Sequence, residues 1–211
     1  QRQRAAAVLR RHGRTFAAEL GAPVSRNTPA PLFQLLCFSL LTSAPVQAGV
    51  AMSGARALRR AGWTTPAKLA DSTWRQRTDT LNRAGYARVD EKTATQLATL
   101  TEQVRRRYRG DLRRLRDEAD GDPARAREAR KAFHGIGDTG AAIFLREAQV
   151  AWPEFQPFVD PAARSAARRL DLPEDPRRLA RLVPQERFAE LVAALVRVKL
   201  KRDYQTVLEA V

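Results

Sequence analysis

The sequence contains very few of the residues that bind metals or form covalent cross-links. Its 211 residues include one cysteine and two histidines, His12 and His134, which are far apart. One cysteine cannot form an intrachain disulfide, and these three residues cannot supply the ligands of a zinc or iron–sulfur site. We therefore expect no metal site. Cys37 lies in an apolar run, residues 35–38, which indicates a buried and unreactive thiol.

Long apolar runs are also absent. The longest, residues 31–41, is interrupted by Gln34 and Ser39 and falls well short of the ~20 apolar residues that span a bilayer. The arginine-rich opening, residues 1–14, lacks the apolar segment of a signal peptide. These features predict a cytoplasmic protein, associated with the nucleoid in a bacterium, that has no membrane partner.

The abundant residues are those that favour helices. The chain has 37 alanines, 33 arginines and 23 leucines but only 2 isoleucines, and no stretch alternates apolar and polar residues as a strand would. The sequence therefore predicts an all-α fold. Glycine, proline and capping residues divide it into helices expected at about 2–20, 32–42, 46–61, 89–108, 123–133, 141–150 and 161–170, with shorter ones after Thr65, Ser72 and Asp111 and terminal ones from Asp175 and Pro184.

The charge balance is strongly basic. Lysine and arginine total 38 against 23 acidic residues, which gives a net charge of +15. Because 44% of the residues are hydrophobic, the chain can bury a core, and its charge is not a sign of disorder. A folded body with this charge attracts polyanions, and arginine suits phosphate better than lysine does. Nucleic acid is therefore favoured over an acidic membrane surface as the partner.

Two segments carry the chemistry that can be inferred from the residues. The first reads Phe-His-Gly-Ile-Gly-Asp-Thr-Gly over residues 133–140, where Gly135 and Gly137 permit a tight turn and a close approach of the backbone to a phosphate at the start of the next helix. The second reads Phe-Val-Asp-Pro-Ala-Ala-Arg over residues 158–164, with Asp160 just before a helix. Each segment also has a plainer interpretation. The first could be an ordinary helix–helix turn capped by Asp138, and in the second Asp160 could be only a helix N-cap.

Together these segments resemble the helix-hairpin-helix DNA glycosylase superfamily, the endonuclease III group. Its hairpin reads roughly Leu-Pro-Gly-Val-Gly-Arg-Lys-Thr-Ala, and its catalytic aspartate follows about twenty residues later in Val-Asp-Thr-His. Further matches occur in order at residues 40–44, at Gly85 and Tyr86, at Lys92, and at Trp152 with Pro153. The resemblance implies two helical lobes with a cleft between them. Residues 28–147 would form a barrel lobe ending in the hairpin motif at about 124–149, and residues 1–27 with 148–211 would form the other lobe.

The resemblance also assigns roles to individual residues. Asp160 would be the catalytic carboxylate, and Thr139 occupies the position of the family's Schiff-base lysine. Ser43, Ala44, Gln47 and Tyr86 are candidates for the wedge or the base pocket. Trp63 and Trp74 are also stacking candidates, although the plainer interpretation, that they are core residues, is favoured for both. The expected DNA contacts are Gly135, Gly137, Asp138, Thr139, Gly140, Lys92 and Arg164.

The departures from the family pattern define the expected activity. Without an amine at Thr139 the imine route is closed, so a monofunctional glycosylase with weak or absent strand cleavage is expected. The cluster cysteines are missing, so the second lobe would depend on apolar packing of the helix at 188–200, and the expected cofactor is none, although the hairpin backbone could hold a monovalent cation. Asp138 puts a negative charge near the phosphate site and should weaken duplex binding.

The expected partner is damaged double-stranded DNA. The protein is expected to be a monomer. A non-catalytic protein that holds bent, nicked or abasic DNA fits the same departures, and retention of Asp160 is what favours the enzyme. A basic RNA-binding module would share the charge but does not explain the order of hairpin and aspartate.

Overall fold

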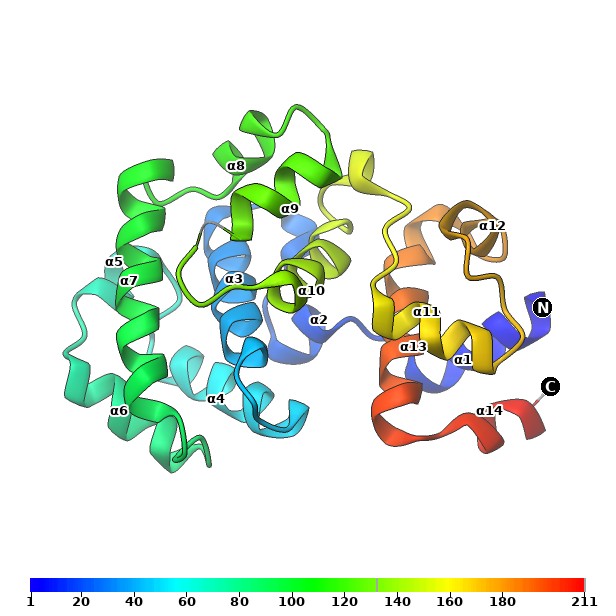
Figure 1. Ribbon diagram of the computed structural model, residues 1–211, viewed down its shortest axis with the longest axis horizontal. Helices are drawn as coiled ribbons and strands as arrows, with labels where there is room; N and C mark the ends of the chain where they lie inside the picture. Colours follow the sequence, from blue (N-terminus) through cyan, green and yellow to red (C-terminus); the bar gives the residue numbers. More distant parts are fainter. Residues whose placement is uncertain (132, 211) are drawn as a thin grey trace.

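The computed structural model describes residues 1–131 and 133–210, and over these residues every regular element is a helix (Figure 1). The prediction of an all-α fold is confirmed. Residues 132 and 211, which fall in the expected hairpin motif and the expected second lobe, lie outside the described residues. The elements are α1 (Arg2–His12), α2 (Phe16–Leu20), η1 (Val24–Arg26), α3 (Pro29–Ser43), α4 (Ala48–Arg60), α5 (Pro66–Ala70), α6 (Trp74–Arg83), α7 (Asp90–Tyr108), α8 (Arg113–Glu118), α9 (Pro123–Lys131), α10 (Asp138–Ala148), η2 (Pro153–Phe155), α11 (Pro161–Arg169), α12 (Pro176–Ala180), η3 (Gln185–Arg187), α13 (Phe188–Lys201) and α14 (Tyr204–Glu209).

The expected helix at 2–20 is two helices, so this prediction was wrong. Helix α1 ends at His12, and α2 begins at Phe16 after a short break. The Thr15 hydroxyl accepts a hydrogen bond from the Ala18 N–H and caps the new helix. A local cap therefore outweighs the favourable helix propensity of the surrounding alanines.

The expected caps account for some of the other helix starts but not for all. Thr65 caps α5 and Asp175 caps α12, as the sequence predicts. Helix α8 begins at Arg113 with Leu112 as its N-cap, and the expected cap, Asp111, accepts a hydrogen bond from the Arg113 N–H. Helix α6 begins at Trp74 under a capping box formed by Thr73 and Gln76, not at the earlier Asp71–Ser72 pair. The reciprocal hydrogen bonds of that box satisfy two backbone donors, which explains why the helix starts there.

The helices form two groups that lie side by side in Figure 1. In the first group, α3 contacts α4, α7 and α10, while α6 and α5 pack on α7. In the second group, α13 contacts α1 and α11, and α1 contacts α14. Contacts between α10 and α13 join the groups. Helix α2, which precedes residue 27, contacts α4 of the first group. The boundary between the two lobes that was expected near residue 27 stays a prediction.

The core is built around α3 and α13, whose side chains are mostly buried. Cys37 is among them, and burial raises the pKa of its thiol, consistent with an unreactive side chain. Among the described residues, no helix combines the length and apolar character that a membrane span requires.

Candidate functional site

A cavity of about 830 Å³, which we call the main cavity, opens between the two helix groups. Its volume lies within the ~300–1,000 Å³ typical of small-molecule sites. Aromatic side chains of α2, α3 and the segment before α11 line it, together with Asp138, Thr139, Asp160 and Arg164. Four residues that the sequence selected for a DNA site thus share one cavity, although they come from two separate segments.

Gly135 and Gly140 are required by the fold. Gly135 has φ of +87°, and a Cβ there would lie 2.6 Å from Leu40 Cδ1 and 2.7 Å from Gln96 Nε2. At Gly140 a Cβ would lie 2.3 Å from Ser43 Oγ, because α10 packs closely on α3. Both positions therefore need glycine for conformation or space, whatever the protein binds.

Gly137 is different, because nothing in the described fold requires a glycine there. It is exposed, its φ is −87°, and a Cβ would meet no atom within 4 Å. It is also the N-cap of α10, so no N-cap side chain accepts hydrogen bonds from the amides that open this helix. Such amides form an anion site at a helix N-terminus, and a glycine beside them admits a close ligand.

Asp160 is the N-cap of α11, so the plainer interpretation of this residue is confirmed. Its Oδ1 accepts a hydrogen bond from the Ala163 N–H at 2.8 Å, and its Oδ2 accepts one from Arg146 Nη1 at 2.8 Å. The residue is 3% exposed but lines the main cavity. A catalytic role for it stays a prediction.

Arg146 is the site residue that the sequence reasoning missed. Its Nε donates to Glu147 Oε1 at 3.0 Å, so one guanidinium bridges the carboxylates of Glu147 and Asp160. Glu147 Oε2 in turn accepts from the Ala17 N–H at 2.9 Å. Burial lowers the pKa of Arg146, but Asp160 and Glu147 outweigh it and the net pKa is raised. The arginine–glutamate pair inside an otherwise apolar helix was the available signal.

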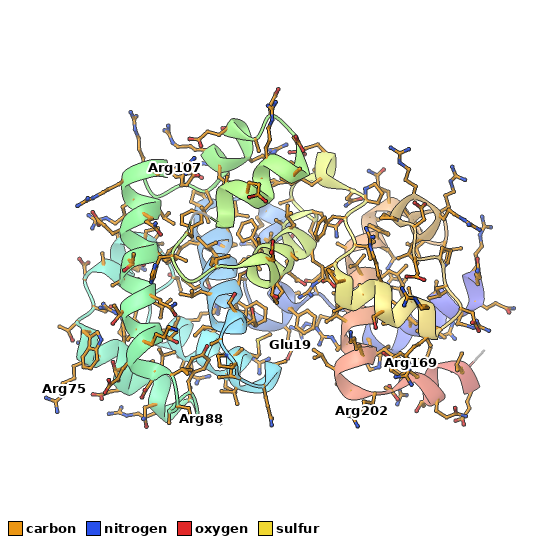
Figure 2. All side chains as sticks on the ribbon, in the orientation of Figure 1. Glu19, Arg75, Arg88, Arg107, Arg169 and Arg202 are labelled. Atoms are coloured by element: carbon orange, nitrogen blue, oxygen red, sulfur yellow. The ribbon has the colours of Figure 1, made fainter. Side chains whose placement is uncertain are left out.

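Phe16 makes cation–π contacts with two guanidinium groups at the edge of this cluster. The Arg146 guanidinium is 4.8 Å from the ring centroid, and that of Arg197 is 4.3 Å from it. Arg197 also pairs with Glu19, which pairs with Arg56 of α4 as well. Figure 2 shows Glu19 near the middle of the molecule, between the two helix groups. The ion pairs and cation–π contacts therefore link α4, α2 and α13 beside the cavity.

The wedge and base-pocket candidates have different surroundings. Ser43 is half-buried, and its hydroxyl donates to the Ser39 carbonyl at 2.8 Å. Ala44 is half-buried, whereas Gln47 is exposed at the start of α4. Tyr86 is 1% exposed and its hydroxyl donates to the Leu41 carbonyl, so it is a core residue that does not line the main cavity. Burial raises the pKa of Tyr86 to about 12.

The remaining candidates lie away from the main cavity. Lys92 is exposed on α7, one helical turn before Gln96, whose side chain lies beside Gly135. Trp63 is partly buried against the core, and the indole N–H of Trp74 donates to Thr95 Oγ1 at 3.1 Å. The two tryptophans therefore do not form a stacking pocket at this site.

A second cavity of about 550 Å³, which we call the side cavity, adjoins the main cavity. Phe16, Val46, Ala48 and Leu200 line both. Within the described part of the chain, no group of three or more His, Cys, Asp or Glu side chains could hold a metal ion.

The sequence matches no protein-family model and no curated protein. Among solved structures, the chain is similar to a trapped endonuclease III–DNA covalent intermediate described as an estranged-adenine complex. The two chains are 16% identical with a TM-score of 0.49, over 77% of this chain and 71% of that one. The function of this chain is therefore inferred from the residues of its own cavity.

Proposed function

We propose that the protein is a monofunctional DNA glycosylase, which extrudes a damaged or mismatched base from duplex DNA into the main cavity and hydrolyses its N-glycosidic bond. The observation that carries the proposal is the meeting of the α10 N-terminus and Asp160 in one cavity lined by Arg164. The order of the hairpin and the aspartate in the sequence, which resembles the glycosylase superfamily, supports it.

DNA binding follows from charge and backbone geometry. A net charge of +15 attracts the duplex, and the amides that follow Gly137 offer a phosphate site at a helix N-terminus. Arg164, on the second helix group, supplies a cation at the same cavity. A base must leave the stack before an enzyme can act on its sugar bond, and a cavity of about 830 Å³ has room for one nucleotide.

Asp160 is the group that would assist bond cleavage. As the C1′–N bond breaks, the base takes the bonding electrons and the sugar becomes positively charged, and an ionised carboxylate stabilises that charge. Water then adds to C1′, and a proton passes to the departing base. Each carboxylate oxygen of Asp160 has a second lone pair beyond its hydrogen bond to Ala163 or Arg146, so it can still accept from water. The reaction needs no cofactor.

A non-catalytic DNA-binding role is the second candidate, and a specific observation favours it. Asp160 is 3% exposed, and both of its oxygens are already engaged, one with a helix N-terminus and one with a guanidinium. A carboxylate with only a structural role would have the same contacts.

A lesion panel separates the two candidates. Labelled duplexes, each with one lesion or mismatch, are incubated with the protein in EDTA, and half of each sample is then treated with hot alkali to break abasic sites. The glycosylase predicts alkali-dependent breaks on one or a few duplexes. Tight binding with no breaks on any duplex supports the non-catalytic role, and the absence of binding rules out both candidates.

A further inference from the structure

Leu200 is an apolar side chain that the fold leaves in water. It is 53% exposed and lies in the last turn of α13. Among the described residues, the other large apolar side chains with comparable exposure are Trp74 and Leu208. Single exposed leucines are common and need no explanation by themselves. The position of Leu200 at the cavities is what distinguishes it from Leu208.

Leu200 lines both the main cavity and the side cavity, whereas each neighbouring lysine lines one of them. Lys199 borders the main cavity and Lys201 borders the side cavity. Successive residues of an α-helix point about 100° apart, so the leucine projects between its two cationic neighbours. Val46, two residues before α4, and Ala48, the first residue of α4, line the same two cavities. In Figure 1 the end of α13 and the start of α4 both lie at the lower edge of the molecule.

The charges around this turn favour a polyanion. Arg164 lines the main cavity with Lys199, and Arg197 lines the side cavity with Lys201. The acidic residue of the side cavity, Glu19, is paired with Arg197 and Arg56. Figure 2 shows a further basic residue, Arg202, just beyond the turn. An exposed apolar tip among cations matches the double-stranded DNA of the proposed function, because phosphates bind cations and a base step accepts an apolar wedge.

We propose that Leu200 is a DNA wedge: it inserts into the base stack beside the extruded nucleotide, while Lys199 and Lys201 contact the flanking phosphates. Apolar side chains that enter a base step unstack it and stabilise bent DNA. Here the wedge would come from the second helix group, opposite Gln47, which lines the side cavity from the first group. The inference rests on the proposed binding of duplex DNA but does not depend on base release.

The insertion can be followed by the fluorescence of 2-aminopurine, which increases when the base loses its stacking neighbours. A duplex carries 2-aminopurine beside the lesion or mismatch that the protein binds most tightly. We compare the parent with Leu200→Ala and with the matched control Leu208→Ala, which removes a leucine that is exposed on α14 and lines neither cavity. We expect the parent and Leu208→Ala to raise the fluorescence equally. Leu200→Ala should lose most of the increase and bind about 3- to 10-fold more weakly, with an unchanged melting temperature.

The flanking lysines have their own readout. The double variant Lys199→Gln and Lys201→Gln should reduce the slope of log K against log salt by roughly 1.8, since each neutralised phosphate contributes ~0.9. Lys68→Gln is the control, because Lys68 is exposed on α5 and lines neither cavity. A slope unchanged in the double variant would contradict the phosphate contacts.

The outcomes of the fluorescence test distinguish this inference from the proposed function. If the parent binds duplex and Leu200→Ala gives the same fluorescence increase, or if the parent gives none, then Leu200 is not a wedge while DNA binding stands. If the parent binds no duplex at any salt concentration, the proposed function itself is wrong.

Discussion

The three hairpin glycines have two different physical explanations. Positions 135 and 140 need glycine because a Cβ there would lie too close to neighbouring side chains. Gly135 also has a positive φ. Gly137 has ordinary dihedral angles and open space around it. The same residue type in the same motif therefore reflects the fold at two positions, and at the third it is consistent with a close ligand.

This difference predicts opposite effects of substitution. Gly137→Val should leave the melting temperature unchanged and weaken duplex binding, because its branched side chain would occupy the space where a phosphate approaches the helix amides. Gly135→Ala should lower the free energy of unfolding by more than ~1 kcal/mol, because a left-handed conformation and a close contact add together. Thermal unfolding and fluorescence anisotropy measure both effects. If Gly137→Val binds duplex DNA as tightly as the parent, the hairpin is only a structural turn.

The buried ion pairs of Arg146 predict a large loss of stability when this residue is replaced. Removing it leaves Asp160 and Glu147 buried without their shared cation, so Arg146→Met should cost about 3–5 kcal/mol of stability. Arg168→Met is the control, because Arg168 pairs with Glu174 at the surface and its loss should change stability little. Urea unfolding gives both values. Equal stabilities of the two variants would mean that the buried cluster does not stabilise the fold.

At the scale of the element, helix bounds were predictable where a local cap or breaker decides them. Thr65 and Asp175 cap the helices expected of them, and α7 spans nearly the range predicted for it. The break between α1 and α2 near residue 13 was not predictable from composition. There a glycine and a threonine cap interrupt a run of strong helix formers. Arg146 was missed for another reason: its partner Asp160 lies 14 residues away in the sequence and reaches it only in the folded chain.

The link between α1 and α14 predicts a pH effect on stability. His12 is buried, and its Nε2 is 2.7 Å from Asp203 Oδ2. Burial lowers the pKa of His12 below 6.5, although Asp203 opposes this change. The unfolded chain then binds a proton at a higher pH than the folded chain, so acidification through about pH 6.5 favours unfolding.

The free energy of unfolding should therefore fall from pH 7.5 to pH 5.5. His12→Gln removes the titrating group and keeps a hydrogen-bonding side chain, so its stability should vary less over this range. Hydrogen bonding to Arg11, above all, lowers the pKa of Asp203, so that carboxylate contributes no change in the same window. Parallel pH profiles for the parent and the variant would contradict the assignment to His12.

At the scale of the whole molecule, the charge is distributed over the surface. Figure 2 shows Arg75, Arg88 and Arg107 at the outer edge of the first helix group, away from the second. The sequence predicts the total charge and the all-α class. It could not predict the rest of the main cavity's lining beyond Asp138, Thr139, Asp160 and Arg164. Phe16, Phe38 and Lys199 meet there only through packing between helices far apart in the chain.

This charge predicts strongly salt-dependent DNA binding. If ~4 to 6 phosphates are neutralised, log K should fall with log salt at a slope of roughly −4 to −5. Fluorescence anisotropy over a range of potassium chloride concentrations measures the slope. An affinity that does not change with salt would rule out a nucleic acid as the partner.

In the proposed function, the negative charge of Asp160 assists release of a base. The most direct test is single-turnover base release by Asp160→Asn on the duplex that the lesion panel identifies, with thermal unfolding to check the fold. Asparagine also caps helices well, whereas loss of a charge that faces a developing cation can raise the barrier by about 3 kcal/mol, on the order of a hundredfold in rate. We predict a rate at least about a hundredfold lower, with duplex binding retained or tighter because a negative charge is removed. Base release at the parental rate by a folded Asp160→Asn would mean that the Asp160 carboxylate does not catalyse the reaction.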